Sequence, residues 1–339
     1  MPSTIKDIRE ETGLSLATIS KYLNGGNVLP ENRVKIEAAV KKLHYEVNEM
    51  ARGLVTNSTR TIGVSVFNVA DVFNSMIIGT IGFELSRRGY GMLVVDAGNS
   101  LKREEENIKF LVSKKVDGII ALPASTNSST MKDAFKANIP IVLIDRRFSD
   151  RSVNSVTIDN REAARSAVDH LIQNGHRKIA IIGGNEAYTA KERIRGYMDA
   201  IRDAGYEVRN DYIFCGEQSI VHGYESMNKI LAMQDRPTAV FSANYEMNLG
   251  AVMALNESEL NYPEDISIVG FDNLLLSKVL RTRLTVVEQP MEKFGVKSVE
   301  ILMQEIQESK KKDYEPAEDS VNITLGTHLL IGNSVKKIG

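Results

Sequence analysis

The chain has 339 residues and a formal net charge of −2; 42% of the residues are hydrophobic and 25% are charged. This balance is ordinary for a globular protein, and the length allows two or three domains with substantial cores. No apolar run approaches the roughly 20 residues that span a bilayer, and the N-terminal segment lacks the apolar core of a secretory signal. Because a single cysteine, Cys215, also excludes an internal disulfide framework, we expect a cytoplasmic protein without a membrane partner.

Residues 4–24 (TIKDIREETGLSLATISKYLN) have the pattern of two short helices joined by a tight turn. Thr4 suits the N-cap of the first helix, with Asp7 at the position of a capping-box acid, and Ser15 suits the N-cap of the second. The exposed face of the second helix carries small, hydroxylic and basic groups that suit a DNA major groove. These are Leu16, Ala17, Thr18, Ser20 and Lys21. An ordinary helical hairpin with a solvated face is an equal alternative at this point, because the geometry is common.

The distribution of charge has the sign that a DNA-binding N-terminal head needs. Residues 1–60 hold nine Lys and Arg and seven Asp and Glu, a balance of +2, whereas the remainder holds 33 and 37, a balance of −4.

A third helix is predicted from Pro30 to about His44. Asn48 can then cap a short helix that Gly53 weakens, so we expect this helix to order only when something holds it. A plain interdomain linker is the alternative.

From Thr61 onward, apolar strands alternate with amphipathic helices, and the pattern begins again after Asp159. Such a pattern indicates parallel sheets that are covered by helices on both faces. The predicted fold is therefore a three-helix helix-turn-helix head followed by an α/β core of two doubly wound parallel-sheet lobes. The predicted domains are the head at 1–47, the hinge helix and linker at 48–60, the first lobe at 61–160 with 290–320, and the second lobe at 161–289 with 321–339.

Open parallel sheets bind ligands at the carboxyl ends of their strands, so we expect a ligand cleft where the two lobes face each other. Three polar residues lie at or just after the ends of predicted strands and should lie at this cleft: Asp145, Asn244 and Asp272.

The sequence does not favour an enzyme. It has no P-loop, and no GxGxxG motif follows the first strand of the core. The five histidines show no metal-ligand spacing, and Cys215 has no identifiable catalytic partner. We therefore expect neither catalysis nor a cofactor or metal site. A solute-binding protein of a transporter would share the two lobes, but it would have an export signal and no head.

Three motifs in order resemble those of the LacI/GalR family of bacterial transcription regulators, and the match covers essentially the whole chain. Residues 15–24 (SLATISKYLN) resemble the recognition helix of the family and residues 48–54 its hinge helix. Residues 269–273 (VGFDN), with Leu284-Thr285 and Gln289-Pro290, resemble its C-terminal signature. The resemblance implies a DNA-binding head on a periplasmic-binding-protein-like core. It further implies a repressor of carbohydrate-metabolism genes, controlled allosterically by a small sugar or sugar derivative bound between the lobes.

The resemblance also assigns DNA contacts. Leu16, Ala17 and Lys21 match positions that read bases, and Leu54 matches the leucine that such hinge helices insert into the minor groove. The predicted DNA-binding residues are Thr4, Ser15, Leu16, Ala17, Thr18, Ser20, Lys21, Asn24, Arg52 and Leu54.

Two residues depart from the family pattern. Lys21 stands where arginine is usual, and lysine lacks the two-pronged donor geometry that arginine offers to guanine. Leu29 stands where a helix-capping serine is usual, so the third helix should begin less firmly.

For the effector site the resemblance selects nine residues. They are Phe73, Asn74, Asp145, Arg146, Thr189, Arg193, Gln218, Asn244 and Asp272. Together they offer carboxylates and amides for vicinal hydroxyls, a guanidinium that can hold two oxygens, and an aromatic face for a sugar ring. Relatives that bind purines carry an aromatic residue in place of Gln218, so we expect a sugar rather than a stacked base. Arg146 and Arg147 beside Asp145 leave an acidic or phosphorylated sugar open.

The implied partners are a palindromic double-stranded DNA operator, the small effector and a second copy of the chain. The absence of a heptad tail after Leu330 favours a homodimer and leaves a tetramer open. One branch of the family binds a phosphorylated carrier protein through tyrosine and arginine on the helix after Gln-Pro. This chain has Glu292 and Glu300 there, so we do not expect such a corepressor.

Overall fold

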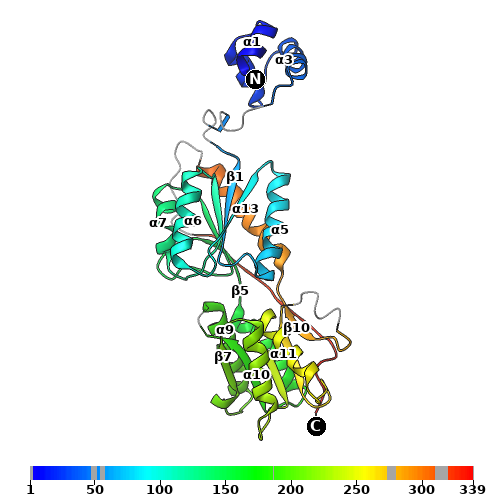
Figure 1. The fold of residues 1–339 in the computed structure, drawn as a ribbon. Coiled ribbons are helices and arrows are strands. Elements are labelled where there is room, and N and C mark those ends of the chain that lie inside the picture. The colour runs from blue at the N-terminus through cyan, green and yellow to red at the C-terminus, as the bar shows by residue number, and fades with distance from the viewer. Residues whose placement is uncertain are drawn as a thin grey trace.

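The computed structural model describes residues 3–46, 52–53, 58–185, 187–272, 280–309 and 320–338. Figure 1 shows a small helical head at the N-terminus and two α/β lobes, with the first lobe between the head and the second lobe. No helix among these residues is long and apolar enough to cross a membrane.

The head consists of α1 (Ile5–Thr12), α2 (Leu16–Leu23) and α3 (Pro30–Lys42). The predicted caps are present. The Thr4 backbone N–H donates to Asp7 Oδ2 at 2.7 Å, and Ser15 Oγ accepts from the Thr18 N–H at 3.1 Å. Gly13 has φ +69° and ends α1 by donating its N–H to the Arg9 carbonyl at 2.8 Å, a left-handed conformation that glycine adopts without strain.

The core of the head is small. Its fully buried apolar side chains are Ile8, Ile19, Ile36 and Ala39, one or two from each helix. At its rim the Tyr22 hydroxyl donates to Glu37 at 2.8 Å and ties α2 to α3. The start of α3 has no side-chain cap, because Leu29 occupies the N-cap position and is 63% exposed. This agrees with the weaker start that the sequence predicts.

The first lobe contains a six-stranded sheet in the order β11-β5-β4-β3-β1-β2, and every pairing is parallel. Its strands are β1 (Thr61–Val66), β2 (Gly91–Asp96), β3 (Gly118–Leu122), β4 (Ile141–Ile144), β5 (Asn154–Ile158) and β11 (Asn322–Leu325). One face is covered by α5 and α13, which lie side by side (Figure 1). The other face is covered by α6 and α7 with the short η1. The helices are α5 (Val72–Arg87), α6 (Leu101–Ser113), η1 (Ser128–Met131), α7 (Lys132–Lys136) and α13 (Met291–Ser309).

The second lobe contains a six-stranded sheet in the order β12-β10-β9-β8-β6-β7, in which only the edge strand β12 is antiparallel. Its strands are β6 (Ile179–Gly184), β7 (Ile213–Gly216), β8 (Ala239–Ser242), β9 (Ser267–Phe271), β10 (Thr285–Glu288) and β12 (His328–Leu330). The pair α8 and α9 covers one face and the pair α10 and α11 the other. The helices are α8 (Asn160–Gln173), α9 (Tyr188–Asp203), η2 (Asn210–Tyr212), α10 (Ile220–Leu231) and α11 (Tyr245–Glu257).

One predicted domain boundary is wrong. The sequence places residues 321–339 in the second lobe, yet β11 pairs with β5 of the first lobe, with Ile323 beside Val156. The chain returns to the second lobe only at β12. The error has a physical origin: β11 is a short edge strand of alternating exposure, and such a pattern predicts a strand without indicating which sheet it extends.

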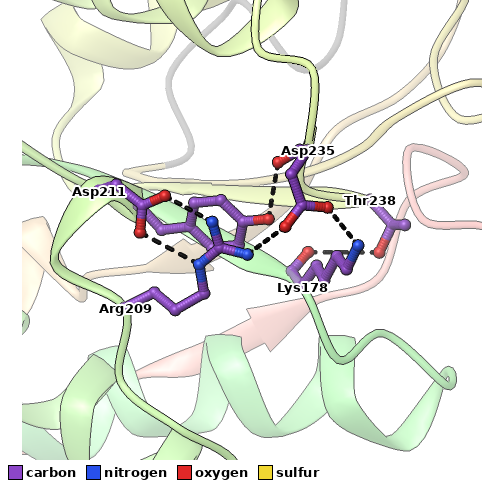
Figure 2. Close-up of polar contacts among 6 residues, drawn as sticks. Lys178, Arg209, Asp211, Asp235 and Thr238 are labelled. Carbon is purple, nitrogen blue, oxygen red and sulfur yellow. Dashed lines mark hydrogen bonds and ion pairs between the residues drawn. The ribbon is translucent and has the colours of Figure 1, made fainter.

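A charged cluster joins the amino-terminal ends of three strands in the second lobe (Figure 2). Arg209 pairs with both Asp211 and Asp235, and Lys178 also pairs with Asp235. The hydrogen bonds from Lys178 and then Arg209 lower the pKa of Asp235 to about 2. The Tyr212 hydroxyl donates to the backbone carbonyl of Asp235 at 2.8 Å. Because these groups satisfy one another at the ends of the strands opposite to the predicted cleft, the cluster is structural.

Candidate functional site

All of the predicted DNA-binding residues on α2 are accessible. Within this helix only Ile19 is buried, since it packs in the head core. Four of the predicted residues are exposed (Thr4, Ser15, Ala17 and Lys21) and four are half-buried (Leu16, Thr18, Ser20 and Asn24). The head therefore presents one continuous helix face of small, hydroxylic and basic groups, the chemistry that major-groove recognition uses.

Hydrogen bonds within the head fix several of these side chains. Ser15 Oγ lies 2.9 Å from Thr18 Oγ1, and Asn24 Nδ2 donates to Ser20 Oγ at 3.2 Å. After α2 the chain turns tightly, with the Gly26 N–H donating to the Lys21 carbonyl at 2.8 Å. A Cβ at Gly26 would lie 2.7 Å from Lys21 Cγ, so a side chain there would displace Lys21. Because Ser15 Oγ also accepts from the Thr18 N–H, Ser15 caps α2 in addition to its predicted contact with DNA.

The predicted hinge is described only in part. Arg52 and Gly53 are helical, whereas residues 48–51 and Leu54 lie outside the described residues. Where the chain reaches the first lobe, Asp117 holds it. The Thr59 N–H donates to Asp117 Oδ1 at 2.7 Å and the Arg60 N–H donates to Oδ2 at 3.2 Å, while the Ser58 hydroxyl bonds to the same carboxylate. Asp117 directly precedes β3, so the linker is fixed to the start of a central strand.

A cavity of about 520 Å³ lies between the two lobes and contains eight of the nine predicted effector residues. Three of them come from the first lobe and five from the second. They are Phe73, Asp145, Arg146, Thr189, Arg193, Gln218, Asn244 and Asp272. Asp145 follows β4, Asp272 follows β9, and Asn244 caps α11, so the residues expected at the strand ends do meet at this cavity.

Asn74 is the exception, and its assignment as a ligand residue is corrected. Its side chain is fully buried and does not line the cavity. Its Nδ2 donates to the Asn68 carbonyl at 2.7 Å, which holds the loop before α5. Consecutive helix residues point about 100° apart because a turn takes 3.6 residues, and Phe73 is the one that faces the cavity.

Arg193 is buried and already bonded within the second lobe. Its Nε donates to Asn160 Oδ1 at 2.8 Å and its Nη1 donates to the Ala243 carbonyl at 2.6 Å. Its guanidinium carbon lies 3.6 Å from the ring centroid of Phe271. Burial lowers the pKa of Arg193, and the carboxylate of Asp272 acts in the opposite direction. The protein therefore occupies two of the donor positions, and Nη2 is the group left for a ligand.

Asp272 is held by the crossover between β10 and α13. Gln289 Nε2 donates to Asp272 Oδ1 at 2.6 Å. Asp272 is 5% exposed and has φ +71°, an uncommon conformation for a residue other than glycine. Burial raises the pKa of Asp272 to about 6, against the opposing effects of Arg193 and of the Gln289 hydrogen bond. Such a carboxyl is poised to bind a donor from a ligand.

Asp145 and Arg146 form the first-lobe side of the cavity. Asp145 also has positive φ, +68°, and its Oδ1 is buried without a hydrogen-bond partner. Arg146 Nε lies 3.9 Å from Asp145 Oδ2, too far for a hydrogen bond, and its guanidinium carbon lies 4.9 Å from the ring centroid of Phe67.

The sequence did not identify several residues that line the cavity. The polar ones are Asn68, Asp71, Asn99, Asn185, Glu217, Glu246 and Gln289. Asp71 is the N-cap of α5, and Glu246 lies two residues after Asn244 in the first turn of α11. Both residues lie within two positions of a predicted site residue in the sequence, and this proximity could have indicated them. Among the described residues, no group of three or more His, Cys, Asp or Glu side chains is arranged to hold a metal ion.

Comparison with known proteins identifies the family. The family described as "Periplasmic binding proteins and sugar binding domain of LacI family" matches residues 59–331. The chain belongs to the LacI family. Catabolite control protein A of Priestia megaterium is 33% identical over 305 residues, covering 89% of this chain and 92% of that protein. The HTH-type transcriptional repressor PurR of Pasteurella multocida (strain Pm70) is 32% identical over 337 residues, covering 98% of this chain and 99% of the relative.

The structural match extends through the head. The lac repressor dimer bound to operator and the anti-inducer ONPF has a TM-score of 0.86 at 25% identity, covering 99% of this chain and 100% of that chain. The predicted family and fold class are thereby confirmed. This LacI-family chain is a DNA-binding transcription repressor and not an enzyme, since its relatives and structural neighbours are transcription regulators.

Proposed function

We propose that this LacI-family repressor binds a palindromic operator as a homodimer, controls genes of carbohydrate metabolism, and responds to a sugar-type effector bound between its lobes. The observation that carries the proposal is the cavity at the strand ends, to which both lobes contribute polar side chains. A ligand that contacts both lobes favours one angle between them, and a change in that angle can reach the heads of a dimer.

The head supplies the DNA contacts of the proposal. Ala17 and Lys21 project from the exposed face of α2, where they would reach base edges and phosphates. Leu54 is proposed as the side chain that enters the minor groove, and Arg52 as its basic neighbour. A two-fold dimer would read two half-sites related by the same symmetry.

A sugar fits the chemistry of the cavity. Carboxylate and amide groups such as Asp145, Asn244 and Asp272 can accept and donate hydrogen bonds to vicinal hydroxyls. The Phe73 ring lies among them and can cover the apolar face of a pyranose. Gln218 occupies the place where purine-binding relatives carry an aromatic residue, which supports a sugar over a stacked base.

Two hydrogen bonds connect the cavity to the crossovers between the lobes. Arg193 donates to Asn160, which begins α8 directly after the β5 crossover, and Gln289 in the β10–α13 crossover donates to Asp272. A ligand that pulls on Arg193 or Asp272 therefore acts on the segments that set the interlobe angle. Asp117 is bonded to residues 58–60, so a movement of the first lobe would also move the linker that leads to the head.

The DNA half of the proposal is tested by selection from a random duplex pool with the purified full chain. We expect enrichment of one near-palindromic site, with an affinity that falls steeply as salt rises because phosphate contacts release counterions. Selection of no palindrome, with or without added sugars, would refute it.

The effector half is tested by a thermal-shift screen of sugars, sugar derivatives and purine bases, followed by operator titration with each hit. A ligand at 100 times its dissociation constant adds about 2.7 kcal/mol to the free energy of unfolding. We expect a sugar-type compound to stabilise the protein and to change operator affinity. Stabilisation by a purine base alone would replace the sugar proposal with a purine one.

A further inference from the structure

The charges that line the interlobe cavity are unbalanced. Among the described residues, five carboxylates line it, from Asp71, Asp145, Glu217, Glu246 and Asp272, against two guanidinium groups, from Arg146 and Arg193. No lysine or histidine is among the lining residues that the structure describes. An effector that enters this space therefore meets an excess of three negative charges when all the groups are ionised.

The protein itself already holds one of the two cationic groups by hydrogen bonds. Two donor positions of Arg193 bond to Asn160 and Ala243, and its guanidinium stacks on the Phe271 ring. The Arg146 guanidinium lies over the Phe67 ring. Arg146 Nε is buried without a hydrogen-bond partner, so Arg146 can donate to a ligand oxygen, but with Arg193 it faces five carboxylates in the same lining.

The acidic groups, in contrast, face one another across the two lobes. Asp71 belongs to the first lobe, and Glu246 and Glu217 belong to the second. Burial raises the pKa of Glu246, and the charges of Asp71 and Glu217 raise it further. Burial likewise raises the pKa of Asp71, with the charge of Asp145 adding to the effect. Among the ion pairs that the described residues form, none contains Asp71, Glu217 or Glu246.

Acceptors without a donor provide a second, independent observation. Asp145 is 8% exposed and Gln289 is 4% exposed; both line the cavity, and Asp145 Oδ1 and Gln289 Oε1 have no hydrogen-bond partner. A buried acceptor that lacks a partner is unfavourable, so each would gain from a donor brought by a ligand or by a ligand's ordered water.

We infer that the effector of this cavity carries a positively charged amine, held between Asp71 of the first lobe and Glu246 and Glu217 of the second, and that phosphorylated and carboxylated ligands are rejected. This inference rests on the proposed function and specifies its ligand class: an amino sugar or a comparable amine with several hydroxyls. The ammonium would draw carboxylates of the two lobes together, so ligand charge would itself favour one interlobe angle.

The test uses the full chain and, for each sugar, a matched set that shares one ring configuration and differs in charge. Glucose, galactose and mannose are each titrated calorimetrically as the neutral sugar, the 2-amino-2-deoxy sugar and the 6-phosphate. We expect at least one amino sugar to bind at least tenfold more tightly than its neutral parent, and none of the phosphates to bind. Glu246→Gln should remove most of that preference, whereas Glu225→Gln, an exposed change on the outer helix α10, should leave it intact.

The outcomes separate the inference from the proposed function. If a phosphate binds, if the amine gives no preference, or if Glu246→Gln leaves the preference unchanged, the inference is overturned. The inference is also overturned if no amino sugar binds while a neutral or anionic compound from the wider screen changes operator affinity. In that case the proposed function stands. If no compound binds and no operator is selected, the proposed function fails and the inference fails with it.

Discussion

The DNA-facing surface of the head and the cavity between the lobes are built in opposite ways. The head presents residues of one helix and its caps, within residues 4–24, and all of them are exposed or half-buried. The cavity takes its residues from both lobes, between Phe67 and Gln289, and its central charged groups are buried. A surface formed within one helix can be recognised from local sequence, whereas an assembled cavity depends on how separate elements meet.

The two regions also differ in what holds them together. The head has four buried apolar side chains, while each lobe has a continuous core on both faces of its sheet. The head is therefore sensitive to loss of packing, and the cavity is sensitive to loss of individual polar partners. A substitution in one region should leave the function of the other unchanged, so the unchanged function serves as an internal control.

The largest effect is expected in the head core. Ile36→Ala removes one of the four buried side chains and should cost about 2–5 kcal/mol, a large share of what so small a core provides. We expect operator binding to be lost while thermal unfolding of the lobes and effector binding are unchanged. Fluorescence anisotropy with operator DNA and calorimetry measure the two quantities. Val34→Ala on the same helix, 65% exposed, is the matched control and should bind operator normally.

A substitution in the cavity should impair effector binding and leave the head intact. Arg193→Ala removes the guanidinium that faces Asp272 and also leaves Asn160 Oδ1 and the Ala243 carbonyl unpaired. Loss of a charge-assisted contact costs about 1.5–3 kcal/mol, which corresponds to about 10- to 100-fold weaker effector binding. The effector response should be abolished at concentrations that act on the wild type, with operator affinity in the absence of effector nearly unchanged.

The control for this change is Arg195→Ala, since the Arg195 side chain is 60% exposed and pairs only with Glu192 at the surface among the described residues. Operator titrations against effector concentration should superimpose for Arg195→Ala and the wild type. A normal response of Arg193→Ala at normal effector concentration would place the effector elsewhere.

Features fixed by local sequence were predictable, and features fixed by tertiary packing were not. The head was predicted well because Thr4 and Ser15 determine its helix caps locally. Asp145, Asn244 and Asp272 were found because parallel strands place their carboxyl ends at one edge. The sheet that β11 joins, the direction of Asn74, and the meeting of Asp71 with Glu246 all depend on tertiary packing. Local sequence patterns do not contain that information.

A smaller effect concerns the titration of Asp272. Because burial raises the pKa of Asp272 to about 6, above its ordinary value of 3.8, the folded state binds the proton more tightly than the unfolded chain does. The charged form therefore destabilises the folded state above pH 6, and this cost disappears as the pH falls toward 4. Asp272→Asn removes the charge and keeps an acceptor for Gln289. We expect the variant to be more stable than the wild type at pH 8.

The stability difference should shrink by about 1 kcal/mol between pH 8 and pH 5, which denaturant unfolding at each pH can measure. Comparing the two proteins cancels the titration of all other groups. Glu225→Gln, an exposed change, should show no such dependence relative to the wild type. A constant difference between Asp272→Asn and the wild type across this range would mean that Asp272 does not titrate near pH 6.

The smallest predicted effect returns to the head, where a stabilising change is available. Leu29 is the N-cap of α3 and is 63% exposed, so its side chain neither caps the helix nor packs in the core. Leu29→Ser would place a hydroxyl where it can accept from the unpaired backbone N–H groups of the first turn. Replacing an apolar N-cap by serine is expected to stabilise the head by about 1 kcal/mol. Because Leu29 lies outside the cavity, effector affinity should not change. Hydrogen exchange of α3 amides measures the gain, and faster exchange in the variant would show that Leu29 has a packing role that outweighs the missing cap.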